Sequence, residues 1–216
     1  MRAAVALGIG LALHAVPVQA HPHVFIDAGV EIQFDTEGRA TAVRVVWVYD
    51  DLTSLLIIED RGLDPDVDGI LTPAETASLA GFDMNWDVGF AGDTYALAGD
   101  VPLVLGPPHD WTVAYDQGRI VSSHLRKLDA PLRPDSVPLV VQVYDPGFYT
   151  SYAIASDPVL TAGAGCAAQV FAPDTDAAQD QLEKALAEFS GDPESDFPAV
   201  GALYAEEVRV TCTGTP

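Results

Sequence analysis

The stretch Val24-Phe-Ile-Asp-Ala-Gly-Val-Glu-Ile-Gln-Phe34 alternates apolar residues with mostly polar ones along its whole length. An alternation with a period of two is typical of a β-strand that buries one face. The turn-forming residues Asp35-Thr-Glu-Gly38 follow, and the segment Thr41–Tyr49 is again rich in valine and aromatic residues. Two such segments around a turn predict an antiparallel hairpin at the start of the domain.

Further short β-type segments follow, with proline and glycine between them, which favours an antiparallel sheet architecture. Residues Asp51–Asp60 and Ala177–Phe189 instead have the apolar spacing of helices. We therefore predict a mainly β, antiparallel β-sandwich-like domain over residues 21–216, with an inserted EF-hand-like helix-loop-helix at 51–80 and one C-terminal helix. The remaining predicted strands are Thr94–Leu97, Val101–Leu105, Trp111–Tyr115, Arg119–Ser123, Val137–Tyr144, Tyr149–Ala155, Ala168–Phe171 and Val208–Thr213.

The composition excludes several classes of protein. The 216 residues include 32 acidic and only 10 basic side chains, for a formal net charge of −22. Because 49% of the residues are hydrophobic and 19% are charged, the chain is not a disordered acidic tail and can bury a sizeable core. So few cations cannot neutralise rows of phosphates, which argues against nucleic acid and anionic membranes as partners. Cations are the ligands that such a surface favours.

The first residues are typical of an export signal. Arg2 precedes a short apolar run, and Val18-Gln-Ala20 resembles a cleavage site, so residues 1–20 are predicted to be a signal peptide. The run is too short for a membrane span, and we expect a mature chain that begins at His21 outside the cytoplasm and does not insert into a membrane. Cys166 and Cys212 then predict one disulfide in an oxidising compartment. A pair of metal thiolates is the weaker alternative, because the CxxC spacing is absent.

One motif indicates calcium. The segment Asp64-Pro-Asp-Val-Asp-Gly-Ile-Leu-Thr-Pro-Ala-Glu75 fits the twelve-residue EF-hand loop, with glycine where the chain must turn sharply. Calcium prefers about six to eight oxygen ligands, and alternate residues of such a loop supply them. Because sensor proteins usually pair such loops, a single one favours a structural role. The alternative is an acidic surface turn. The predicted ligands are Asp64, Asp66, Asp68, the Ile70 carbonyl, Thr72 and Glu75.

The predicted mature N-terminus, His21-Pro22-His23, indicates a transition metal. Its α-amine and two imidazoles can bind Zn, Ni, Co or Cu. Pro22 lacks an N–H, which excludes the square-planar mode that uses successive backbone amides. Ligands from elsewhere would have to complete the site, and the candidates are Asp27, His109 and His124. For each single histidine the alternative is a residue without a metal role.

The order of these motifs also resembles a known family. His21-Pro-His-Val-Phe-Ile-Asp27, Val46-Trp-Val-Tyr-Asp-Asp51, the acidic loop and Val143-Tyr-Asp-Pro-Gly-Phe-Tyr149 look like the exported family catalogued as domain of unknown function 1007. Both cysteines fit the C-terminal pattern of that family. It is described as the periplasmic component of an uncharacterised ABC-type transport system. The resemblance implies a periplasmic location and a permease of the nickel/cobalt type as partner. It also makes Asp145 a candidate ligand, although an Asp-Pro pair after a strand is commonly only a turn.

These observations lead to one main functional hypothesis and two rivals. The main one is a non-enzymatic periplasmic metal-binding accessory protein of a transition-metal (Ni, Co, Zn or Cu) transport system, with a structural calcium loop. The first rival is a calcium-stabilised extracytoplasmic interaction or adhesion module without a transition-metal role. The second is a copper enzyme built on His21. Nucleophilic catalysis has little support, because neither a GxSxG motif nor a phosphate-cradling glycine loop occurs.

Overall fold

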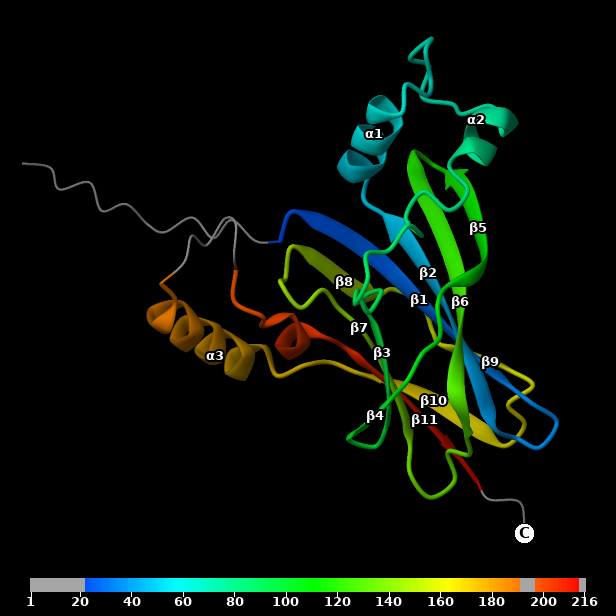
Figure 1. Ribbon diagram of the computed structural model, residues 1–216, viewed down its shortest axis with the longest axis vertical. Coiled ribbons are helices and arrows are strands. Elements are labelled where there is room, and N and C mark those ends of the chain that lie inside the picture. Colours follow the sequence, from blue (N-terminus) through cyan, green and yellow to red (C-terminus); the bar gives the residue numbers. More distant parts are fainter. Residues whose placement is uncertain (1–21, 191–196, 214–216) are drawn as a thin grey trace, which may run out of the picture.

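Two β-sheets pack against each other in the computed structural model of the chain, which describes residues 22–190 and 197–213. Helices lie at one end and to one side of the sheets (Figure 1). The predicted signal peptide 1–20 and His21 lie outside the described residues.

The opening hairpin is confirmed. Strand β1 (Val24–Phe34) pairs antiparallel with β2 (Ala40–Tyr49), from Ile26 opposite Tyr49 to Phe34 opposite Ala40. Every second residue of β1 from Ile26 onward is buried, as the alternation predicts. The turn between the strands is held by Asp35, whose carboxylate accepts hydrogen bonds from the backbone N–H groups of Glu37 and Arg39 at 2.9 Å.

The first sheet has six strands. Its main path is β5-β6-β2-β1-β8, and β9 also pairs with β1. Most pairs are antiparallel as predicted, but β1 runs parallel to both β8 and β9. Residue periodicity carries no information on strand direction, so the sequence could not predict these two pairings. The bounds are His109–Asp116 for β5, Arg119–Leu132 for β6, Thr150–Ile154 for β8 and Val159–Thr161 for β9.

The second sheet has five strands in the order β10-β11-β7-β3-β4. The predicted disulfide is confirmed, because Cys166 and Cys212 are bonded and lie opposite each other on the paired strands β10 and β11. The bounds are Thr94–Ala98 for β3, Val101–Leu103 for β4, Leu139–Val143 for β7, Cys166–Phe171 for β10 and Glu207–Cys212 for β11.

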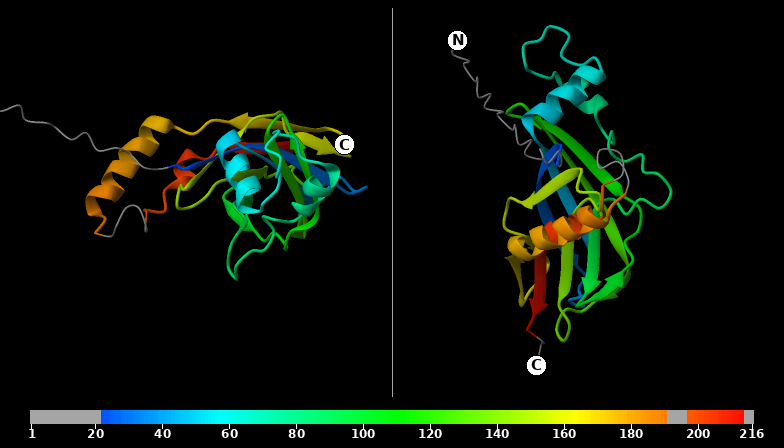
Figure 2. Two further views of the ribbon diagram at one scale, coloured as in Figure 1. Left: turned by 90° about the horizontal axis from the view of Figure 1, so that it is seen from above. Right: turned by 90° about the vertical axis from the view of Figure 1, so that its left-hand side faces the viewer.

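One hydrophobic cluster joins the inner faces of the two sheets. Figures 1 and 2 place α1 (Asp51–Asp60) and α2 (Pro73–Ser78) at one end of the sheets and α3 (Thr175–Glu188) to the side, where the 3-10 helix η1 (Gly201–Tyr204) contacts it. Among the described residues, no helix combines the length and hydropathy that a membrane span needs. The fully buried members of this cluster are Ile32, Ala40, Val43, Val45, Leu79, Ile120, Leu139, Val141, Val208 and Val210.

Helix α1 has its expected bounds, with Asp50 as the N-cap that accepts a hydrogen bond from the N–H of Thr53 at 2.8 Å. Its leucines face the solvent rather than the core. Ser54 and Ile58 are the buried residues of this helix, whereas the exposed fractions are 63% for Leu52, 58% for Leu55 and 55% for Leu56.

Candidate functional site

The acidic loop between α1 and α2 gathers three carboxylates. Oxygen atoms of Asp64, Asp66 and Asp68 all lie within 4.8 Å of one another. Gly69, at the position where the motif requires a sharp turn, has a φ of 77°, in the left-handed region that favours glycine. The carboxylate of Asp64 accepts hydrogen bonds from the N–H groups of Asp68 at 3.1 Å and Gly69 at 3.0 Å. The loop therefore curls around its own first residue.

Glu75 closes the loop. Its Oε1 accepts a hydrogen bond from the N–H of Asp64 at 3.3 Å, and its Oε2 accepts from the N–H and the hydroxyl of Thr72 at 2.8 and 2.7 Å. Thr72 is the N-cap of α2, Pro73 occupies its first turn, and Thr72 and Glu75 form a capping box. The last expected ligand thus also begins the exiting helix.

Apolar and aromatic contacts anchor the loop to the sheets. Leu71 and Leu79, on either side of α2, are buried members of the main core. The hydroxyl of Tyr115 on β5 donates to the carbonyl of Gly69 at 3.4 Å. The helix before the loop does not run directly into it. Helix α1 ends at Asp60, and the chain then turns at Gly62, which has a φ of 63°, before it reaches Asp64.

Electrostatics favour a cation in this loop. The pKa of Asp66 is raised above its ordinary value. A hydrogen bond from the backbone N–H of Asp66 itself lowers this pKa, but the nearby carboxylates of Asp68 and Asp64 raise it by more. Hydrogen bonds from Thr72 lower the pKa of Glu75, so its carboxylate stays ionised at pH 7. A cluster of ionised oxygens around a tight turn is the donor set that a hard cation such as calcium prefers. The residues present therefore fit that ion.

The two segments singled out by the family resemblance lie side by side. The N–H of His23 donates to the carbonyl of Tyr149 at 2.8 Å, and their ring centroids are 4.8 Å apart. Directly after this contact, Val24 lies opposite Thr150 in the parallel pair of β1 and β8. His23 is exposed, so its imidazole is accessible from solvent.

Asp145 holds the turn of the second segment together. Its carboxylate accepts hydrogen bonds from the N–H groups of Gly147 at 2.9 Å, Tyr149 at 2.9 Å and Thr150 at 3.0 Å. Gly201 of η1 packs against the backbone of Asp145, so closely that a Cβ added to Gly201 would lie 1.7 Å from the carbonyl oxygen of Asp145. Asp145 is therefore a turn-forming residue that positions Tyr149 beside His23.

The other candidate ligands are held elsewhere. Asp27 forms an ion pair with Arg119 at 2.8 Å, and His109 contacts Asp110 at 2.9 Å. His124 lies on the inner face of β6 with no exposed surface. Within residues 22–190 and 197–213, the acidic loop is the one group of three or more metal-ligating side chains close enough to share an ion. The structure thus does not bring Asp27 or His124 to His23.

A cluster of buried and half-buried polar side chains, which was not among the predicted sites, lies inside the sandwich. Tyr49 and Ser122 donate hydrogen bonds to Asp83 at 3.0 and 2.5 Å. Tyr152 donates to Asp93 at 2.8 Å. Burial raises the pKa of Asp93 to about 7, although the bond from Tyr152 lowers it. These residues come from separate strands and from the loop before β3, so no local pattern could have indicated them.

His124 belongs to this buried region. Its ring lies 4.8 Å from that of Trp47 and 5.4 Å from that of Trp86, in edge-to-face geometry with both. Both of its ring nitrogens lack a hydrogen-bond partner among the described residues. Burial, together with the positive charges of Arg126 and Arg44, lowers the pKa of His124 to about 4, so its imidazole is neutral at pH 7.

Comparison with known proteins identifies a family. None of the curated proteins compared with the chain matches it. The model of the family described as "Protein of unknown function (DUF1007)" matches residues 6–212, which is most of the chain. The match spans β1 to β11, the acidic loop and the disulfide. The chain therefore belongs to the DUF1007 family of proteins of unknown function.

Proposed function

We propose that the protein is an extracytoplasmic, non-enzymatic metal-binding accessory of a transition-metal transport system. The exchangeable metal binds at the His21-Pro-His23 terminus, and calcium binds in the Asp64–Glu75 loop as a structural ion. The Cys166–Cys212 disulfide supports a location in an oxidising compartment such as the periplasm. A permease in the membrane is the partner that the family resemblance implies.

The observation that carries this proposal is the contact between His23 and Tyr149. His23 and Tyr149 are 126 positions apart in the sequence. The backbone N–H of His23 donates a hydrogen bond to the carbonyl of Tyr149, and the centroids of their rings are 4.8 Å apart. Imidazole is a good ligand for Zn, Ni, Co and Cu, and an accessible one suits a metal that must be passed on. The turn built by Asp145 supports the site by fixing Tyr149.

Calorimetric titration of the chain that begins at His21 tests the proposal, with Ca, Zn, Ni and Cu in turn. We expect one transition metal to bind separately from calcium and to lose at least tenfold in affinity in His23→Ala. An extra residue ahead of His21 should weaken the same metal and leave calcium binding unchanged. His109→Ala is the matched control, because His109 lies beside Asp110 in β5. Equal transition-metal binding by wild type and His23→Ala would refute the site.

The second candidate is a calcium-stabilised interaction module. The exposed leucine face of α1 (Leu52, Leu55 and Leu56) favours it, because such a row at helical spacing suits docking of the helix into an apolar groove. Residues 50–75 contain eight acidic side chains and one arginine, so the groove would need a basic rim. Calcium binding without any transition-metal binding in the same titration would favour this candidate.

A further inference from the structure

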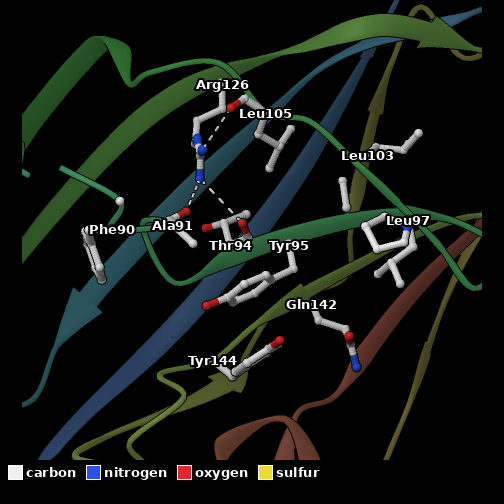
Figure 3. Close-up of a pocket in the computed structure, with 13 residues that line it drawn as sticks. Phe90, Ala91, Thr94, Tyr95, Leu97, Leu103, Leu105, Arg126, Gln142 and Tyr144 are labelled. Carbon is white, nitrogen blue, oxygen red and sulfur yellow. Dashed lines mark hydrogen bonds between the residues drawn. The ribbon is translucent and has the colours of Figure 1, made fainter.

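A cavity of about 380 Å³ lies where β3 and β4 of one sheet approach β6 of the other. Figure 3 shows Arg126 at one end of it and the rings of Tyr95 and Tyr144 toward the other. The volume is within the range of small-molecule sites. None of the residues discussed for the calcium loop or for His23 lines this cavity.

The charge of the lining is opposite to that of the protein. Of the described residues that line it, Arg126 is the one with a charge, and none is an aspartate or glutamate, in a chain with 32 acidic and 10 basic residues. Arg126 as a whole residue is 6% exposed, and the central carbon of its guanidinium lies 5.1 Å from the centroid of the Trp86 ring. It donates to the carbonyls of Gly106 at 2.9 Å and Leu105 at 3.2 Å, as well as to those of Ala91 and Thr94.

These carbonyls orient the guanidinium but do not neutralise it. No carboxylate forms an ion pair with Arg126 among the described residues. A buried cation held by neutral dipoles attracts an anion more strongly than an exposed one does, because water screens it less. The Arg126 end of the cavity is thus electropositive within an acidic protein.

Thr94 supplies a second, independent observation at the same end. It lines the cavity and is 2% exposed, and its carbonyl is a partner of Arg126 at 3.4 Å. Its hydroxyl has no hydrogen-bond partner in the described part of the chain. Buried hydroxyls are normally paired, because an unpaired one costs free energy. A carboxylate bound at the Arg126 guanidinium would supply the partner that this buried hydroxyl lacks.

The rest of the lining suits a flat apolar body. Tyr95 and Tyr144 stack with centroids 4.1 Å apart and planes 13° apart, and both line the cavity. Leu97, Leu103 and Phe90 add apolar surface, and Gln142 adds one amide (Figure 3). Rings and aliphatic side chains favour an aromatic or alicyclic group.

We propose that this cavity binds a small organic carboxylate, with the carboxylate at Arg126 and Thr94 and the apolar body against Tyr95 and Tyr144. This site is independent of the proposed metal function. A metal cation is an unsuitable occupant, because the lining provides neither imidazole nor carboxylate and its one charge is positive.

The probes are benzoate, 4-hydroxybenzoate, indole-3-acetate and cyclohexanecarboxylate, each paired with its neutral amide. Binding to the full mature chain is measured by saturation-transfer NMR and by tryptophan fluorescence, because Trp86 contacts Arg126. We expect at least one carboxylate to bind tenfold or more tightly than its amide. Equal binding of acid and amide, or binding of none of the four acids, overturns the proposal.

Variants at Thr94 locate the site. Thr94→Val keeps the shape of the side chain and removes the hydroxyl, so the affinity for the best acid should fall at least fivefold while the melting temperature stays the same or rises. Thr94→Ser retains the hydroxyl and should retain the affinity. Thr211→Val, at an exposed position of β11, is the matched control. The proposal is wrong if Thr94→Val binds the acid as tightly as Thr211→Val does.

Discussion

The backbone N–H of Asp64 donates a hydrogen bond of 3.3 Å to Oε1 of Glu75, so the first and last residues of the acidic loop are in direct contact. Within the loop that this contact closes, oxygens of Asp64, Asp66 and Asp68 lie within 4.8 Å of one another. Like charges at such distances repel, and a bound cation relieves that repulsion. The loop is therefore the place where added calcium should stabilise the fold.

Glu75→Gln tests this expectation. Glutamine can still accept the capping-box hydrogen bond from Thr72, so α2 keeps its start, but the carboxylate charge and the acceptor for the Asp64 N–H are lost. We expect calcium at a hundred times its dissociation constant to add about 2.7 kcal/mol to the free energy of unfolding of the wild type and much less to that of the variant. Urea denaturation with and without calcium measures both. Glu59→Gln at the exposed end of α1 is the control and should respond to calcium as the wild type does.

Asp93→Asn should change how stability depends on pH. Burial raises the pKa of Asp93 from 3.8 to about 7, so between these values the folded chain keeps a proton that the unfolded chain has released. This carboxyl therefore makes the free energy of unfolding fall as pH rises through that window, by at most about 1.4 kcal/mol per pH unit. Asparagine should remove that fall. Urea denaturation from pH 4 to 8 tests it, and identical pH profiles for wild type and variant would contradict it.

His124→Gln should have the opposite effect on the pH profile. Burial lowers the pKa of His124 from 6.5 to about 4, so in this range the unfolded chain binds a proton that the folded chain does not. The imidazole thus contributes stability that is present above pH 6.5 and lost as pH falls toward 4. The variant should lose this acid sensitivity, whatever its absolute stability. His109→Gln serves as the control in the same denaturation series.

Gly201→Ala should disturb the contact between His23 and Tyr149. An added Cβ would lie 1.7 Å from the Asp145 carbonyl oxygen, so η1 or the Asp145 turn must move. We expect a lower melting temperature and weaker transition-metal binding in calorimetry, with calcium binding retained. Gly106→Ala is the control, because its Cβ would meet the Lys127 carbonyl at an ordinary 3.5 Å. Transition-metal affinity equal to that of the control would contradict the supporting role of the turn.

Replacing two exposed leucines of α1 should cost little stability. Leu52→Ser combined with Leu55→Ser removes side chains that are more than half exposed, so we expect less than about 1 kcal/mol of change in the free energy of unfolding. Ile58→Ala on the buried side of the same helix should cost about 2–5 kcal/mol. Chemical denaturation measures both, and a large loss in the double variant would mean that the leucines are packed rather than exposed.

The strand and helix pattern could be predicted well from the sequence. The alternation in Val24–Phe34 and the capping residues Asp50 and Thr72 act over a few neighbouring positions, and β1, α1 and α2 follow them closely. Strand β6 extends to Leu132, well beyond the predicted Ser123, because its pairing with β2 continues past the local pattern. The short strand β9 was missed, since three residues carry too little periodicity.

Among the candidate sites, too, features formed by neighbouring residues could be predicted, whereas features that depend on distant contacts could not. The acidic loop could be predicted because all of its expected ligands lie within twelve residues, and the disulfide could be predicted because the sequence contains only two cysteines. Local spacing could not predict that Leu52, Leu55 and Leu56 would face solvent, because an apolar row does not specify which side of a helix meets the core.

The sequence by itself determined the mainly β fold, the hairpin, the two flanking helices and the loop of carboxylates, because these depend on interactions between near neighbours. Tertiary structure alone decided that His124 is buried against Trp47, that His23 meets Tyr149, and that Arg126 and Thr94 share one end of a cavity. Each of these contacts joins strands or loops far apart in the chain. Sheet order and strand direction create them, and neither is encoded in local periodicity.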